Sequence, residues 1–263
     1  MVIAGTAVLG IALAAPPAGT QGMMQHVDLR SPKMTTAELT REEVKALQAM
    51  ATPERPADLS NKSLNGLDLS GLDLSWADLR WARLNKTNLR GAKLAGARLD
   101  LAWAIEADLT DADLSGATLF QAQLPRARLD RADLSGALVV ANFEGASLKG
   151  AKLRDVRGAP DMRNQSMGLT RTVLRSARLE GADLSGAMLA YADLEFAKLQ
   201  GAVLASADLS MARLGGANLT GATVTNLNIA GADLASAILK ELAGADAILG
   251  LDQAHNLQRA FRD

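Results

Sequence analysis

The sequence predicts an all-β solenoid, a chain wound into stacked coils around a thin apolar core. A leucine returns at every fifth residue from Leu59 to Leu99 without interruption. A small residue, most often alanine, stands two positions before most of these leucines, as in Ala77-Asp78-Leu79. In addition, 48% of the residues are hydrophobic although only 3% are aromatic, whereas an ordinary globular core uses aromatic rings to fill its volume.

A period of five residues fits neither a straight helix nor a straight strand. On an α-helix each step of five turns by about 500°, so successive leucines would point about 140° apart. In a straight strand they would point to opposite faces. Both difficulties disappear if each unit is a very short strand followed by a corner of about a quarter turn, because four units then close one coil and the coils stack about 4.8 Å apart. Leucine and alanine then fill the interior, and the other three residues face water.

Several runs of the sequence carry a family likeness. The run Ala107-Asp108-Leu109-Thr110-Asp111-Ala112-Asp113-Leu114-Ser115-Gly116 resembles the pentapeptide-repeat family, and the resemblance extends over residues 57–249. It implies a right-handed quadrilateral β-helix, the fold of that family. A repeat signal of this kind predicts the fold far better than the function.

The first segment, residues 1–20, is apolar from Val2 to Ala15. Its small residues would suit cleavage by signal peptidase, but no lysine or arginine precedes the apolar run, which is shorter than the about 20 residues that span a bilayer. An apolar tail is costly to leave in water, so we interpret the segment as signal-like or anchoring. This predicts a periplasmic or membrane-anchored protein, with membrane association through residues 2–15. An unfolded tail is the alternative.

Residues 21–56 are expected to form a linker and an N-terminal capping helix. Proline and glycine are frequent up to residue 35, as in linkers. Thr40 and Glu43 have the spacing of a capping box, which predicts a helix beginning near Arg41. We expect this helix to cover the open end of the first coil, where unpaired strand edges would otherwise favour aggregation.

The repeats form two arrays, at residues 57–153 and 169–249. In the first array the period slips by one residue after Val139, which a four-residue unit or a bulged corner would absorb. The repeat pattern is lost over residues 154–168, for which we expect a protruding, interrupting loop.

The last segment, residues 250–263, is expected to be a C-terminal capping helix. Apolar residues recur there at helical spacing, at Leu251, Ala254, Leu257 and Phe261. The same residues could instead pair two copies of the chain end to end as a homodimer.

Composition and pattern argue against catalysis. The chain has no cysteine and only two histidines, His26 and His255, which are far apart in sequence. The filled interior leaves no cavity in which polar groups could converge. The aspartates that recur before the leucines are best explained as a solvated face. We therefore expect no enzymatic activity, no cofactor and no metal.

Large apolar residues at outward positions are the candidates for contact with a partner. Residues twenty apart should stack, which places Trp81 beneath Leu101 and Tyr191 beneath Met211. The full set of candidates is Trp76, Trp81, Leu101, Trp103, Tyr191, Phe196 and Met211. For the tryptophans near the N-terminal end, packing under the capping helix or linker is the alternative.

The charge balance separates the remaining functions. The formal net charge is −1, which argues against direct binding of nucleic acid. We therefore expect a non-enzymatic scaffold or protein-interaction module, exported or associated with the envelope of a bacterium, with an unidentified protein partner. The resemblance offers an alternative, since some pentapeptide-repeat proteins mimic DNA, bind DNA gyrase and protect it from quinolones. Arg83, Lys93 and Arg98 interrupt the acidic columns and stand against this alternative.

Overall fold

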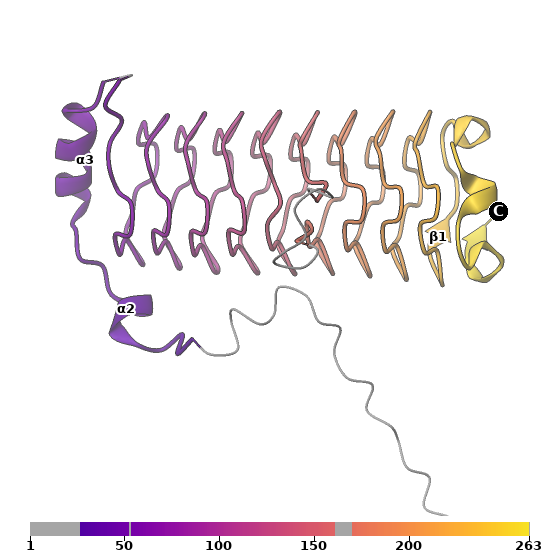
Figure 1. Ribbon diagram of the computed structural model, residues 1–263, viewed down its shortest axis with the longest axis horizontal. Helices are drawn as coiled ribbons and strands as arrows, with labels where there is room; N and C mark the ends of the chain where they lie inside the picture. The colour runs from indigo at the N-terminus through magenta and orange to yellow at the C-terminus, as the bar shows by residue number, and fades with distance from the viewer. Residues whose placement is uncertain (1–26, 53, 161–169, 263) are drawn as a thin grey trace, which may run out of the picture.

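The computed structural model describes residues 27–52, 54–160 and 170–262. These residues form a rod of stacked coils, with the helix α3 at one end and the C-terminus at the other (Figure 1). The signal-like or anchoring segment 1–20 lies outside the described residues. Among the residues that are described, no helix is long and apolar enough to cross a membrane.

Four columns of parallel backbone bridges run along the rod. The first coil pairs with the second at an interval of twenty residues: Asp58 with Asp78, Ser63 with Arg83, Asp68 with Asn88, and Asp73 with Lys93. The strands are so short that most are single bridges. The two named strands, β1 (Ile238–Leu239) and β2 (Phe261–Arg262), pair in parallel near the C-terminus. Each five-residue unit therefore supplies one side of a coil.

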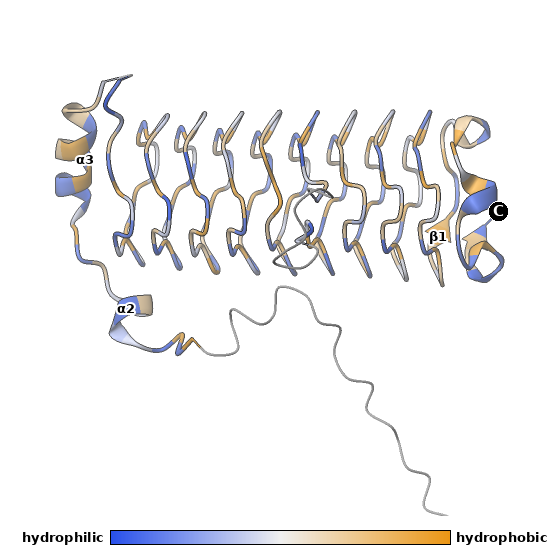
Figure 2. Ribbon diagram, in the orientation of Figure 1, coloured by the Kyte–Doolittle hydropathy of each residue, from blue (hydrophilic) through white to orange (hydrophobic). Residues whose placement is uncertain are grey.

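Leucine and alanine fill the interior of the rod. The leucines at five-residue spacing from Leu59 to Leu99 are at most 1% exposed, and Ala77 and Ala112 beside the column are equally buried. Burying one leucine side chain contributes about 1.5–3 kcal/mol. Apolar and polar residues alternate around each coil (Figure 2), so the core is continuous along the axis and only one side chain deep.

Aspartate at the outward position before leucine shapes the corner that follows. The Asp68 carboxylate accepts a hydrogen bond from the Ser70 N–H at 3.0 Å, and Asp73 accepts one from Ser75 at 3.1 Å. Asparagine can do the same, as Asn88 does with the N–H of Arg90. The recurrence of aspartate therefore has a structural cause beyond the solvated face expected from the sequence, because its side chain accepts from a backbone N–H two residues ahead.

The slip after Val139 is a four-residue unit. Gln123 pairs with Asn142, an interval of nineteen instead of twenty, and the following bridges keep the shorter interval. The shortened corner lies between Leu138 and Asn142, which belong to neighbouring columns.

The interruption begins later than we expected. Arg157 still pairs with Leu138 and Met188, so residues 154–158 belong to the coil. The first array therefore extends beyond residue 153, where we expected it to end. Asn142 pairs with Val173, and 173 − 142 = 31, which is 11 more than the regular 20. The expected boundary was wrong because Gly158 occupies a leucine position and hides the repeat. Residues 161–169, which carry most of the expected loop, lie outside the described residues.

Gly158 and Thr172 close the coil beneath this insertion. A Cβ atom on Gly158 would lie 2.5 Å from the Thr172 hydroxyl and 2.6 Å from the Leu189 side chain. The buried Thr172 hydroxyl donates to the backbone carbonyls of Val139, at 2.9 Å, and Gly158, at 2.8 Å. Position 158 has glycine where the repeat usually has leucine, and position 172 has threonine where it usually has alanine. The larger threonine fills the volume that the missing leucine side chain leaves, so the core remains packed across the insertion.

Two helices precede the first coil. The predicted helix is α3 (Arg41–Ala49), and it begins with the capping box of Thr40 and Glu43. Its Val44 is fully buried against the core. A second, short helix, α2 (Pro32–Thr35), lies in the segment for which we expected only linker. Proline at its first position explains the difference, because proline starts helices as well as interrupting them.

The prediction of a C-terminal capping helix is wrong. Residues 243–262 form a further coil whose units are six residues long, with bridges from Ala243, Leu249 and His255 to the preceding coil and β2 against β1. The extra residues form three 3₁₀ turns, η1 (Ala245–Ala247), η2 (Leu251–Gln253) and η3 (Leu257–Arg259).

Apolar residues that recur about every three residues fit 3₁₀ turns as well as an α-helix, so the spacing alone could not distinguish the two. Gly244, Gly250 and Asn256, six residues apart, precede the turns in left-handed conformation and were the missed signal. The second array thus continues beyond residue 249. The helix on which a homodimer was expected to rest does not form.

Candidate interaction surface

One corner of the rod carries bulky apolar residues in left-handed conformation. It lies between the column that starts at Asp58 and the column that starts at Ser63. We call its four residues the apolar corner: Trp81, Leu101, Tyr191 and Met211, with φ values of 62°, 61°, 63° and 58°. For L-residues this conformation costs on the order of 1–2 kcal/mol, which glycine avoids. Backbone conformation alone would therefore favour glycine at these four positions.

Another corner of the same rod shows the contrast. Between the columns that start at Asp68 and Asp73, the corresponding positions are held by glycine or by charged residues, for example Gly71, Gly91 and Arg131. Their φ values lie in the same left-handed range. The concentration of apolar side chains is thus specific to one corner.

Two further apolar residues beside the apolar corner were missed from the sequence. Phe120 is 40% exposed and Met188 is 45% exposed, comparable with Trp81 at 49% and Met211 at 47%. Phe120 immediately precedes the corner residue Gln121, and Met188 lies in the adjoining column of bridges.

The structure separates the other predicted contact residues from this group. Trp103 is half-buried in the adjoining column, where it pairs with Arg83 and Gln123. Trp76 and Phe196 lie at two other corners. A Cβ atom on Gly96 would lie 2.3 Å from the Trp76 ring, and one on Gly216 would lie 2.6 Å from the Phe196 ring.

Each of these two rings therefore packs along the rod over a glycine of the next coil. Met211 does the same over Gly231, at 2.4 Å from the position of a Cβ. Trp76, Phe196 and Met211 thus have a structural role, although they remain 62%, 60% and 47% exposed. Of the seven candidates, four share one corner: Trp81 and Leu101 lie on consecutive coils, and Tyr191 and Met211 lie on another consecutive pair that begins four coils beyond Leu101.

Ion pairs between coils neutralise the charged columns. Asp78 accepts a hydrogen bond from Arg80 at 2.6 Å and lies 3.7 Å from Arg98. The hydrogen bonds from Arg80 hold the pKa of Asp78 below its ordinary value although partial burial opposes the shift. Asp111 pairs with Arg131 of the next coil at 2.7 Å. Like charges that stack at the coil spacing repel, as Asp58 and Asp78 would, and the ion pairs with arginine lower that cost.

A second network lies on a neighbouring face. Arg175 and Arg213 each contact both Asp193 and Glu195. The side chain of Asp193 is only 9% exposed, so its charge is held by both guanidinium groups. We interpret this network as structural, because all four side chains are paired with one another.

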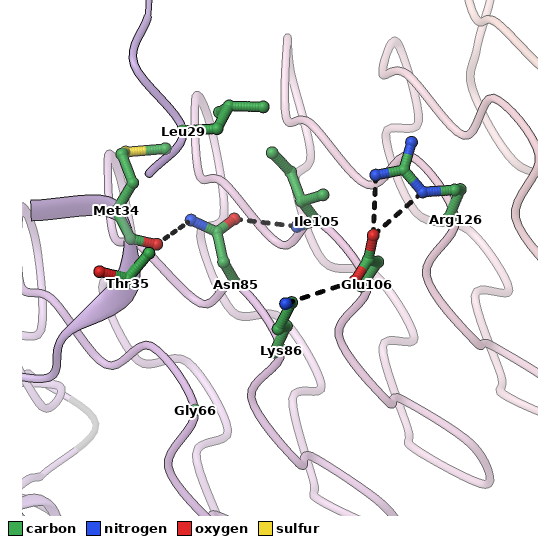
Figure 3. Close-up of a pocket in the computed structure, with 9 residues that line it drawn as sticks. All are labelled: Leu29, Met34, Thr35, Gly66, Asn85, Lys86, Ile105, Glu106 and Arg126. Atoms are coloured by element: carbon green, nitrogen blue, oxygen red, sulfur yellow. Dashed lines mark hydrogen bonds and ion pairs between the residues drawn. The ribbon is translucent and has the colours of Figure 1, made fainter. Parts of the chain in front are cut away.

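Across the described ranges, no group of three or more histidine, cysteine, aspartate or glutamate side chains could hold a metal ion. One hollow of about 320 Å³ lies between α2 and the corner that carries Lys86, Glu106 and Arg126 (Figure 3).

The family model of pentapeptide repeats matches the chain in eight copies, over residues 57–85, 73–111, 82–119, 104–136, 169–205 and 202–240. The chain is a pentapeptide-repeat protein. Proteins of this family fold as right-handed quadrilateral β-helices, and the four columns of bridges in this member are in keeping with that architecture. No curated protein matches the chain in sequence.

Solved structures of the same family resemble this pentapeptide-repeat protein. HetL, a pentapeptide repeat protein involved in heterocyst differentiation regulation from the cyanobacterium Nostoc sp. strain PCC 7120, is 35% identical, with a TM-score of 0.68 over 78% of this chain and 84% of HetL.

Two others are less similar. Rfr23 from the cyanobacterium Cyanothece 51142 is 32% identical over 42% of this chain and 58% of its own, with a TM-score of 0.20. QnrB1, a plasmid-mediated fluoroquinolone resistance protein, is 17% identical over 76% of this chain and 91% of its own, with a TM-score of 0.33.

Proposed function

We propose that this protein is a non-enzymatic interaction module that binds a protein partner through the apolar corner. The observation that carries the proposal is the presence of bulky apolar side chains in left-handed conformation at one corner, where glycine would serve the fold better. Exposed aromatic and methionine side chains are enriched at protein contact surfaces, and here they lie in a row along one edge of the rod.

The irregular units of the rod support this location. The four-residue unit lies between Leu138 and Asn142, and the insertion lies between Arg157 and Val173. Both therefore fall at the corner that carries Trp81 and Met211, on consecutive coils. Departures from a repeat at one place on a rigid rod favour a functional role for that place.

The relatives are compatible with a binding role. HetL, at 35% identity, is described as involved in the regulation of heterocyst differentiation. We carry over only the general idea that a pentapeptide-repeat rod can act by binding another protein.

The experiment that tests the proposal compares variants of the full-length protein as bait. Trp81→Asn with Leu101→Asn removes two apolar side chains but keeps the left-handed corner, because asparagine tolerates that conformation, as Asn61 does here. The matched control is Arg131→Asn, at a left-handed position of another corner. We expect a partner captured by the natural protein and by the control to be lost from the double variant. Equal capture by all three would contradict the proposal.

Export or envelope association is the second part of the proposal. It rests on the apolar run from Val2 to Ala15. Fractionation of cells that express the full-length chain tests it: we expect the protein in the periplasm or membrane fraction. A product found only in the cytosol with Met1 retained would contradict it.

Mimicry of DNA towards gyrase is the alternative function. A DNA mimic needs an extended negative surface, whereas the acidic columns here are interrupted and paired, as at Asp78 with Arg98 and Asp111 with Arg131. A gyrase supercoiling assay distinguishes the two. We expect no inhibition and no protection at micromolar concentrations, and either effect would favour the alternative.

A further inference from the structure

The hollow between α2 and the rod lies on a different corner from the apolar corner. From the first coil to the third, its wall is formed by Gly66, Asn85 and Ile105, and α2 with the preceding Leu29 forms the other side (Figure 3). Its volume of about 320 Å³ is at the lower end of small-molecule sites.

The walls of the hollow are fixed by hydrogen bonds. The Asn85 side chain donates to the Met34 carbonyl at 3.1 Å and accepts from the Ile105 N–H at 3.1 Å. Asn65 and Ser63 bond in addition to carbonyls of Lys33 and Thr36. Because these amides and carbonyls are already paired, the part of the lining left for an aliphatic group is formed by Leu29, Met34 and Ile105, beside the polar side chains of Thr35 and Asn85. The site is therefore preformed and carries an apolar patch inside.

The rim of the hollow carries more positive than negative charge. Arg126 donates two hydrogen bonds to one oxygen of Glu106, at 3.1 and 2.8 Å. Lys86 lies 3.8 Å from the other oxygen, too far for a hydrogen bond, and its ammonium makes none within the described part of the chain. Two cations thus share one carboxylate, and the Lys86 ammonium faces Glu106 at the rim of the hollow (Figure 3).

We propose that this hollow binds an aliphatic carboxylate, with its apolar body against Leu29, Met34 and Ile105 and its carboxylate at Lys86 and Arg126. The proposal is independent of the function assigned to the apolar corner. Such a group could come from a small aliphatic acid or from the C-terminus of a protein that ends in an apolar residue. The rim is open to water, so we expect affinity in about the millimolar range for an eight-carbon acid, falling with salt.

Gly66 offers a way to block the hollow without disturbing the fold. It lines the hollow with a φ of 69°, and a Cβ atom there would have nothing within 4 Å. Gly66→Asn places a polar side chain in that space. Gly71→Asn is the matched control, because Gly71 lies one unit further along with a φ of 67°, has the same open surroundings and does not line the hollow.

The test is ligand-observed NMR titration of the full-length protein with octanoate and with octanol. We expect octanoate to bind more tightly than octanol, Gly66→Asn to weaken octanoate at least tenfold, and Gly71→Asn to change it less than twofold. The double variant Lys86→Gln with Arg126→Gln alters only exposed side chains and should reduce octanoate binding to the level of octanol. Equal binding of the two ligands, or octanoate binding unchanged in both the glycine and the charge variants, would overturn the proposal.

A second arm separates the two sources of the carboxylate. A short peptide ending in leucine is titrated with a free C-terminus and with an amidated one. Tighter binding of the free peptide than of octanoate assigns the site to protein C-termini, and the reverse assigns it to small acids. Failure of octanoate and both peptides to bind would contradict the proposal without affecting the partner-capture experiment at the apolar corner.

Discussion

Glycine and aspartate have separate tasks at single corners of the coil. Glycine supplies the left-handed turn and, at Gly96, leaves the space into which the Trp76 ring packs. Aspartate fixes the entry to a corner by accepting a backbone hydrogen bond, as Asp73 does from Ser75. Both tasks could be predicted only in part from the sequence. The five-residue spacing indicates where corners lie but does not reveal which side chain leans over the next coil.

Gly96→Ala should destabilise the protein more than Gly91→Ala. Both glycines have left-handed φ values, 65° and 60°, so both variants incur about 1 kcal/mol of backbone strain. Only at Gly96 would the added methyl displace an aromatic ring, at a further cost of about 0.5–1.5 kcal/mol. Chemical denaturation measures the difference. It should vanish in a Trp76→Ala background, and an equal cost in that background would show that the ring is not responsible.

Asp73→Ala should lower stability by about 1 kcal/mol, because the Ser75 N–H loses its acceptor. Asp73→Asn should retain most of the stability, since asparagine accepts the same bond elsewhere in this rod, as Asn88 does. Thermal denaturation at neutral pH compares the stabilities of the two variants. If both were equally unstable, charge and not the hydrogen bond would be the stabilising feature.

The five-residue unit is tolerant of insertion and deletion as long as the coil closes. The sequence predicted the slip after Val139, because it is directly visible in the leucine spacing, and left a four-residue unit and a bulged corner as the two ways to absorb it. It did not predict that Arg157 continues the coil, because the next inward positions carry Gly158 instead of a leucine and Thr172 instead of an alanine. The six-residue units at the C-terminus escaped notice for a similar reason, because a spacing of three between apolar residues was attributed to an α-helix.

Residues 159–171 should be removable without loss of the fold. We expect a variant in which Ala-Tyr, the pair found at Ala190 and Tyr191, replaces them, together with Gly158→Leu and Thr172→Ala, to fold and to melt at or above the natural temperature. The shorter connection lowers the entropic cost of closing the coil. Circular dichroism with thermal denaturation tests this.

The matched control for this excision is Gly158→Leu alone. It should destabilise by about 1–3 kcal/mol, because the new side chain would collide with Thr172 and Leu189. An excised variant that failed to fold would show that the insertion is part of the core architecture.

At the scale of the whole molecule, a core one side chain deep is stabilised by repetition along the rod, and the outer surface by compensated charge. Hydrogen bonds from Ser70 hold the pKa of Asp68 below its ordinary value, those from Ser75 do so for Asp73, and those from Arg80 do so for Asp78. The sequence predicted the long leucine core, but the pairing of charges between coils required the register of twenty residues.

Acid should destabilise the rod below about pH 4. Carboxylates whose pKa is lowered in the folded state contribute stability that is fully present above their unfolded pKa of about 3.9. That contribution is lost as pH falls through the lower folded values. We expect the melting temperature to be nearly constant from neutral pH down to about 5 and to fall steeply below 4. A melting temperature that rose on acidification would contradict the assigned pKa directions.

The central claim is that the interior of the rod serves the fold, whereas the apolar corner serves binding. The most direct measurement is the melting temperature of the Trp81→Asn, Leu101→Asn double variant beside the natural protein. Because both side chains are partly exposed and asparagine relieves left-handed strain, we predict an equal or higher melting temperature. A marked fall would mean that these side chains stabilise the rod, and it would contradict the account.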